Sequence, residues 1–78
     1  MEHTAILRNW MPVPVSTGLY YVGEIHQDTK KRFEDGTLIH TAPVLKEYKT
    51  ETENGVQTYA ETLNSIYLLE GMEANSIK

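Results

Sequence analysis

The chain has 78 residues, no cysteine and a formal net charge of −4 at neutral pH. This length accommodates a single domain, and such a chain buries only roughly 60–65% of the surface that its unfolded form exposes. The absence of cysteine excludes a disulfide framework and a thiolate-ligated metal site. Stability must therefore come from an efficient core or from oligomerisation.

The charge is unevenly distributed along the chain. Residues 1–33 carry four basic and three acidic groups, a net of +1, whereas residues 34–78 carry three basic and eight acidic groups, a net of −5. The basic cluster of Lys30, Lys31 and Arg32 is too small for the broad cationic surface that general nucleic-acid binding needs. No apolar window approaches the roughly 18 residues of a membrane span, so we expect a cytoplasmic protein without membrane contact.

The first third of the chain predicts two strands joined by a turn. Residues 4–10 form a short strand, and residues 11–15 contain two prolines that cannot donate to a ladder, which places them at a sheet edge or in an extended segment. A turn follows at residues 16–18, and residues 19–26, rich in β-branched and aromatic side chains, form the next strand. Gly23 inside this strand indicates a bulge or the close approach of another backbone.

A polar loop comes next, at residues 27–31. Residues 32–33 predict a short strand of their own. Asp35 and Gly36 then form a hairpin turn, because glycine adopts a positive φ angle at little cost.

The strand predicted at residues 37–44 is bent. Ile39 and Val44 have opposite parity, so a regular strand would place them on opposite faces. Pro43 lacks the N–H needed for pairing. We therefore expect a bulge or bend at residues 41–43 that brings Ile39 and Val44 to the same side.

The last third of the chain predicts two or three further strands and a second hairpin turn. Residues near the C-terminus are expected to fray. The segments are strands at residues 45–52 and 56–63, residues 64–69 as an extension of the latter or as a separate short strand, a turn at Asn54 and Gly55, an end at Glu70 and Gly71, and a frayed terminus at residues 72–78.

The regular spacing of the turns predicts one small all-β domain covering residues 1–78. We expect a small antiparallel barrel of the SH3-like kind or a strongly bent sheet, with five to six short strands. A helix over residues 59–73 stays open as an alternative, because Tyr59, Leu63 and Ile66 keep a rough spacing of three and four.

Two predicted strands are apolar on both faces, at residues 19–22 and 66–69. A chain of this size offers few places to bury such a strand. One explanation is a closed barrel whose outer face is covered by the N-terminal arm. The other is a subunit interface or a docking patch for a partner.

The sequence contains no motif for catalysis or for cofactor binding. His3, His26 and His40 are spread over different elements and lack the spacing of a metal site. No glycine-flanked nucleophile, Walker loop or dinucleotide fingerprint is present. We therefore expect neither an enzyme nor a protein with a metal or cofactor.

Some polar and aromatic residues could serve either the fold or a binding site. Arg32 could form an ion pair with Asp35 at the turn, and Asn64 could satisfy backbone groups at a strand kink, which would be structural roles. Trp10 is typical of a core or interface anchor. The candidate binding residues are Trp10, Tyr20, Arg32, His40, Thr41, Asn64 and Tyr67.

Two stretches, RFEDGTLIHTAPV at residues 32–44 and TLNSIYLL at residues 62–69, carry a resemblance. Together they resemble a pattern in small uncharacterised proteins of bacteriophages and prophages. Ala42 and Leu38 depart from it, since the pattern often has a serine and a polar residue there. The matching positions are Arg32, Phe33, Asp35, Gly36, Thr37, Ile39, Thr41, Val44, Thr62, Asn64, Ser65, Tyr67 and Leu69.

The resemblance implies a class of role for the chain. The leading hypothesis is a phage-derived protein that inhibits a host protein, such as a defence component, by stoichiometric binding. The second is a homo-oligomeric sponge for a nucleotide immune signal. A third hypothesis does not depend on the resemblance: a small nucleic-acid-binding barrel in which Tyr20 and Tyr21 lie near the basic cluster. In the sponge, the nucleotide would bind in a pocket at the subunit interface, where Arg32 would contact its phosphate. The pocket would be lined by Arg32, His40, Thr41, Asn64 and Tyr67.

Overall fold

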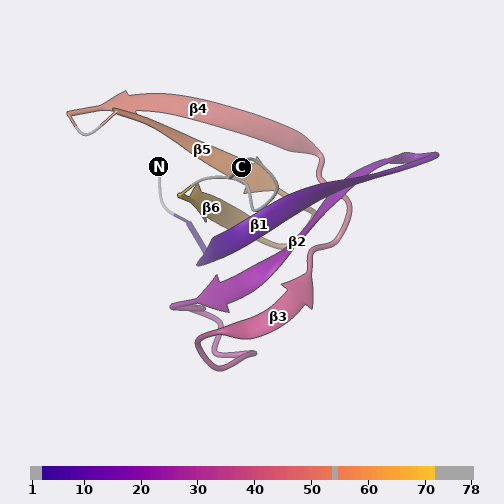
Figure 1. The fold of residues 1–78 in the computed structure, drawn as a ribbon, viewed down its shortest axis with the longest axis horizontal. Coiled ribbons are helices and arrows are strands. Elements are labelled where there is room, and N and C mark those ends of the chain that lie inside the picture. Colours follow the sequence, from indigo (N-terminus) through magenta and orange to yellow (C-terminus); the bar gives the residue numbers. More distant parts are fainter. Residues whose placement is uncertain (1–2, 54, 72–78) are drawn as a thin grey trace.

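The computed structural model describes residues 3–53 and 55–71, and within them the chain forms six strands and no helix (Figure 1). The all-β prediction is confirmed, and the alternative helix over residues 59–73 is wrong, because strands occupy most of that range. None of the described residues belongs to a helix that could span a membrane. The strands are β1 (Ala5–Val15), β2 (Gly18–His26), β3 (Thr37–His40), β4 (Lys46–Thr52), β5 (Gly55–Glu61) and β6 (Ile66–Glu70).

All six strands belong to one mixed sheet with the order β3-β2-β1-β6-β5-β4. Two antiparallel meanders, β1 to β3 and β4 to β6, meet at the central parallel pair of β1 and β6. The strongly bent sheet was predicted, but it does not close into a barrel, and the parallel pair was not expected. Its cause is the link from β3 to β4, where the chain crosses to the opposite edge without reversing direction (Figure 1).

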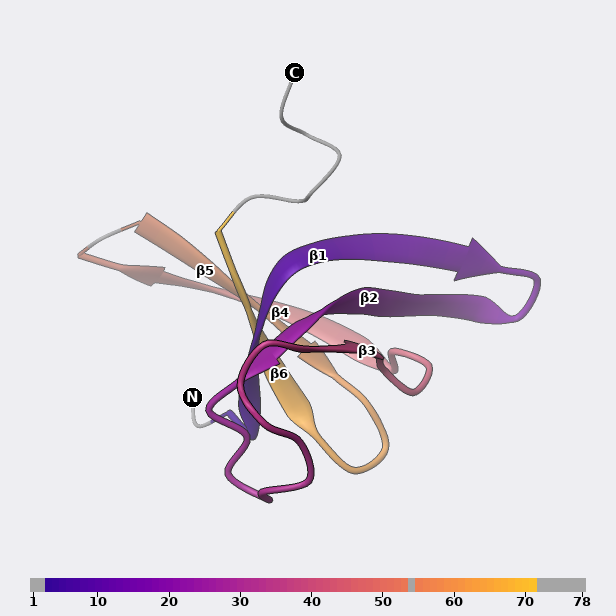
Figure 2. The same ribbon diagram turned by 60° about the horizontal axis from the view of Figure 1, so that its bottom comes forward.

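A bulge divides β1 into two halves. Arg8 pairs with Glu24 and Met11 pairs with Val22, so two residues of β1 face Gly23 alone. A Cβ atom on Gly23 would lie 3.0 Å from the carbonyl oxygen of Arg8, which confirms the predicted close approach. Only the first half of β1 pairs with β6, and the second half projects with β2 as a hairpin arm (Figure 2).

The bend after β3 confirms the prediction made from Pro43. The Thr41 amide donates to the Tyr21 carbonyl and the Val44 amide to the Leu19 carbonyl, each at 2.8 Å. The chain therefore advances three residues while β2 advances two, which is a one-residue bulge. As a result Ile39 and Val44 both pack against the inner core, as expected.

The central position of β6 explains why residues 66–69 are apolar on both faces. Tyr67, Leu68 and Leu69 are all buried. Full burial of a large aliphatic side chain stabilises a fold by about 1.5–3 kcal/mol. Neither a closed barrel nor a subunit interface is needed there. The inner cluster consists of Ala5, Leu7, Tyr21, Ile25, Ala60, Tyr67 and Leu69, and the outer cluster of Ile6, Tyr59 and Leu68.

The connection from β2 to β3 differs from the sequence prediction. No strand forms at residues 32–33, and residues 27–36 are one long loop. Asp35 and Gly36 form the predicted tight turn, closed by a hydrogen bond from the Thr37 amide to the Glu34 carbonyl at 3.1 Å, with Gly36 at a φ angle of 88°. The turn ends the loop and does not join two strands as a hairpin. A two-residue hairpin fails here because β2 ends at His26, nine residues before Asp35. The predictions for Asn54 and for residues 72–78 lie outside the described residues.

Candidate functional site

The structure does not gather the predicted binding residues into one site. One set lies where the loop of residues 27–36 meets the turn between β5 and β6, a second lies on the inner face, and a third lies on the outer face. The sets are Arg32, Asn64 and Tyr67 at the loop, Trp10 and Thr41 on the inner face, and Tyr20 and His40 on the outer face.

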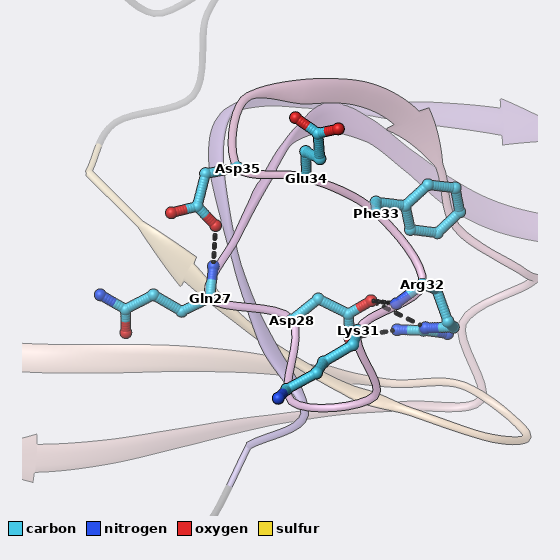
Figure 3. Close-up of a pocket in the computed structure, with 7 residues that line it drawn as sticks. All are labelled: Gln27, Asp28, Lys31, Arg32, Phe33, Glu34 and Asp35. Atoms are coloured by element: carbon cyan, nitrogen blue, oxygen red, sulfur yellow. Dashed lines mark hydrogen bonds and ion pairs between the residues drawn. The ribbon is translucent and has the colours of Figure 1, made fainter.

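The buried carboxylate of Asp28 and the partly exposed guanidinium of Arg32 form an ion pair inside the loop (Figure 3). One carboxylate oxygen of Asp28 accepts hydrogen bonds from the Arg32 amide at 2.9 Å and from its Nε at 3.0 Å. The other accepts from the Lys30 amide and from Arg32 Nη2, both at 3.1 Å. Arg32 Nη1 donates to Ser65 Oγ at 3.2 Å, so the pair also ties the loop to the β5–β6 turn.

The predicted pairing of Arg32 with Asp35 is wrong. Asp35 instead accepts a hydrogen bond from the Gln27 amide at 2.8 Å. Arg32 pairs with Asp28 because the Asp28 side chain is fully buried and also accepts a hydrogen bond from the Arg32 amide, which holds the two residues together. A bidentate pair of this kind is stronger than an exposed ion pair.

The protonation states of the pair follow from its contacts. Burial alone would raise the pKa of Asp28, but hydrogen bonds from Arg32 and Lys30 and the charge of Arg32 together hold that pKa below its usual value. The pKa of Arg32 is raised, chiefly by its hydrogen bond to Asp28 and against the effect of burial. Both groups are therefore charged at neutral pH.

Further hydrogen bonds dock the loop onto the end of the sheet. The amide and the hydroxyl of Thr29 both donate to the Thr4 carbonyl at 2.8 Å. The Lys30 ammonium donates to the Asn64 carbonyl. Thr4 in turn receives a hydrogen bond on its hydroxyl oxygen from the Ile66 amide at 3.0 Å. Arg32 and Asn64 therefore have structural roles, because both hold the loop against the turn between β5 and β6.

A shallow hollow of about 590 Å³ lies against this loop (Figure 3). Its lining carries charges of both signs, and Lys31 extends away from Glu34 and Asp35. Three of the five N–H donors of Arg32 are directed at Asp28 and Ser65. An anion bound at Arg32 would lie beside the negative charge of Asp28.

Thr41 and Trp10 also have structural partners. The Thr41 hydroxyl accepts from the Tyr21 amide at 3.0 Å and donates to the Ala42 carbonyl at 2.8 Å, which fixes the bend after β3. Trp10 packs edge-to-face on Tyr21 with ring centroids 5.5 Å apart. Both residues therefore support the inner face.

The outer face of β2 and β3 is different, because it carries the exposed side chain of Leu38 beside the half-buried Tyr20 and Val22. We call the surface formed by Tyr20, Val22, Leu38 and His40 the β2–β3 face. Leu38 is 71% exposed, and the Tyr20 and His40 rings contact each other with centroids 5.7 Å apart. These residues, with Ile39, line a hollow of about 250 Å³. The apolar surface continues over β1, where Val13 is paired with Tyr20.

Sequence reasoning missed two residues that define these regions. Asp28 precedes Lys30 by two positions, the spacing of a turn in which an aspartate accepts from the backbone, and this signal was present in the sequence. Leu38 is next to Ile39 in the same strand, so its side chain lies on the opposite face of the sheet. Because Ile39 was predicted to lie in the core, the exposure of Leu38 could also have been predicted.

Comparisons of the chain with protein-family models, with curated proteins and with solved structures find no match. Within residues 3–53 and 55–71, no group of three or more histidine or carboxylate side chains is placed to hold a metal ion.

Proposed function

We propose that this chain is a non-enzymatic binding protein that associates stoichiometrically with another protein through the β2–β3 face. The observation that carries this proposal is Leu38, a large apolar side chain with 71% exposure among other apolar and aromatic groups. Contiguous exposed apolar surface of this kind marks interaction sites, and aromatic residues are enriched where binding energy concentrates. Tyr20 and His40 supply such groups here.

The resemblance to small bacteriophage and prophage proteins supports a particular partner. On this proposal, the partner is a host protein, such as a component of bacterial defence, and the chain acts in the cytoplasm of the bacterial host. Inhibition requires only that the bound chain occupies a surface that the host protein needs.

The two alternatives have less support from the arrangement of side chains. A nucleotide sponge depends on Arg32, whose guanidinium already donates to Asp28 and Ser65. Arg32 and His40 also line different hollows. For nucleic-acid binding, two members of the basic cluster are engaged, because Lys30 donates to a backbone carbonyl and Arg32 pairs with an aspartate.

A matched pair of leucine variants tests the proposal. Leu38 and Leu63 are 71% and 79% exposed, but only Leu38 lies on the β2–β3 face. Leu38→Glu and Leu63→Glu should both keep the melting temperature, because exposed positions tolerate substitution within about 0.5 kcal/mol. The tagged wild-type chain is used to capture a partner from a bacterial lysate, and binding is then repeated with the purified partner by calorimetry.

We expect a 1:1 complex that forms with the wild-type chain and with Leu63→Glu, and that is lost with Leu38→Glu. Equal binding by Leu38→Glu would contradict the assignment of this face. The absence of any partner that binds at near-physiological salt would contradict the proposed function itself.

A further inference from the structure

The backbone of β3 has one side that the sheet does not use. The Leu19, Tyr21 and Ile25 carbonyls of β2 accept hydrogen bonds from residues 44, 41 and 36, so the odd-numbered residues of β2 face β3. In an antiparallel ladder these groups alternate, and Ile39 opposite Gly23 is directed inward. The N–H and C=O groups of Leu38 and His40 therefore point away from β2, and β3 is the last strand of the sheet on this side.

Two other exposed stretches of strand, in β1 and β4, are protected. In β1, the hairpin is closed by the pair Val15 and Gly18, so Pro12 and Pro14 are the residues whose nitrogen atoms face away from β2. Proline has no N–H, and these two positions cannot donate to an added strand.

The edge of β4 is protected by charge. The β4–β5 hairpin is closed by the pair Thr52 and Gly55, so the residues of β4 that face outward carry the side chains of Glu47, Lys49 and Glu51. Charged side chains on an edge disfavour pairing with another strand. Residues 37–41 contain neither a proline nor an Asp, Glu, Lys or Arg side chain, so β3 lacks both kinds of protection.

The hollow beside this edge fits a side chain of an added strand. A strand paired with β3 directs every second side chain to the outer face of the sheet. There it meets the hollow of about 250 Å³ that Tyr20, Val22, Leu38 and His40 line together with Ile39. The walls are largely apolar and aromatic, so a large apolar side chain is the complementary occupant.

Charge identifies the kind of segment further. Glu34 and Asp35 precede β3 directly, and Glu24 lies beside Leu38 on the outer face. An antiparallel strand would place its C-terminal end near Glu34 and Asp35. A basic residue on that side of the apolar anchor would meet these carboxylates.

A second copy of this chain is a poorer occupant of the edge. The chain has a net charge of −4, so two copies repel each other. β3 has only four residues, and a symmetric β3–β3 contact offers little of the roughly 1,200–2,000 Å² that stable protein interfaces bury. A short edge with an adjacent side-chain hollow instead matches domains that bind extended peptides by strand addition.

We infer that β3 is a strand-addition edge: the partner contributes an extended segment that pairs antiparallel with Leu38 and His40 and seats one large apolar side chain on the β2–β3 face, followed by a basic residue. This inference rests on the proposed function and specifies how the partner is recognised.

A peptide selection tests the recognition mode. The full chain is immobilised and a displayed library of random ten-residue peptides is selected against it. We expect enriched peptides with a large apolar residue followed within a few positions by Lys or Arg. Each backbone nitrogen of a synthetic enriched peptide is then methylated in turn. Affinity should fall by about fivefold or more at every second position, because only alternate amides face β3.

Variants of the chain separate the backbone from the side chain. His40→Ala and His40→Pro both remove the imidazole, but only proline also removes the outward N–H. We expect His40→Pro to lose about tenfold more affinity for the enriched peptide than His40→Ala. Lys49→Pro, which removes an outward N–H on the β4 edge, is the matched control and should bind as the wild type does.

Three results would overturn the inference. The first is a methylation profile without a two-residue period. The second is equal binding by His40→Ala and His40→Pro. The third is a chain that sediments as a dimer without peptide and as a monomer when His40 is replaced by proline. If the purified partner binds and depends on Leu38 while one of these results is found, strand addition is wrong and the proposed function stands. If no partner and no peptide binds, both are wrong.

Discussion

The second half of β1 and the whole of β3 are both strands with one side facing away from the sheet, yet their sequences treat that side differently. In β1 the outward positions are Pro12 and Pro14, which cannot donate a hydrogen bond. In β3 they are Leu38 and His40, which keep their N–H groups and stand beside an exposed apolar face. The difference indicates that one edge is closed to pairing and the other is open to it.

The two edges are also anchored differently. β1 turns into β2 through the two residues Ser16 and Thr17. β3 is reached through the ten-residue loop 27–36, which is held by the buried carboxylate of Asp28. A charged anchor makes the β3 edge sensitive to acid, whereas the turn of β1 has no ionisable group.

The largest effect is expected when the anchor of the β3 edge is removed. Asp28→Asn abolishes the ion pair with Arg32 and leaves partly buried donors unsatisfied. We expect a loss of about 2 kcal/mol in the free energy of unfolding at pH 7, measured by urea denaturation. Asp35→Asn, in the same loop but exposed, is the control and should lose less.

The same variant gives a pH test. The pKa of Asp28 is lowered by folding from an ordinary value of 3.8. Its stabilising contribution is therefore complete above that value and is lost as the pH falls through the lower value of the folded protein. The difference in unfolding free energy between wild type and Asp28→Asn should shrink from pH 7 to pH 2. A difference that stays constant over this range would contradict the role of the Asp28 charge.

A smaller loss is expected at the bulge that separates the edge half of β1 from the half paired with β6. In Gly23→Ala the added Cβ would lie 2.9 Å from Leu7 Cγ and 3.0 Å from the Arg8 carbonyl oxygen. β1 and β2 must move apart to accommodate it, at a cost of about 1–2 kcal/mol in unfolding free energy. An unchanged urea midpoint would show that the two strands do not approach so closely.

The smallest effect on stability is expected from opening the β1 edge. The double variant Pro12→Thr and Pro14→Thr restores two outward N–H groups and should lower stability by less than about 1 kcal/mol, through a more flexible unfolded chain. Its self-association should increase, as measured by sedimentation velocity. If the double variant stays as monodisperse as the wild type, the two prolines do not protect this edge.

Local signals in the sequence were enough to predict several features of the fold. Pro43 and the parity of Ile39 and Val44 predicted the bend, and Gly23 predicted the close approach of two backbones. Both depend on steric rules that act within a few residues. Pro12 and Pro14 predicted that residues 11–15 lie at a sheet edge or in an extended segment, and these residues pair with β2 alone.

Features that depend on strand order could not be predicted. No local pattern reports that β6 pairs with β1 at the centre of the sheet, so the two apolar faces of residues 66–69 suggested an interface. Arg32 was assigned to Asp35 by proximity in sequence, whereas burial and the path of the loop direct it to Asp28. The binding residues were the least well predicted part, because Arg32 and Thr41 have structural partners within the fold.

Amide hydrogen exchange in the isolated protein, followed by NMR, tests the central claim most directly. We predict that the amides of Leu38 and His40 exchange at least about tenfold faster than those of Ile39 and Thr41, because only the latter two face β2. An enriched peptide should then slow the exchange of Leu38 and His40. Slow exchange of all four amides in the isolated protein would contradict an open β3 edge.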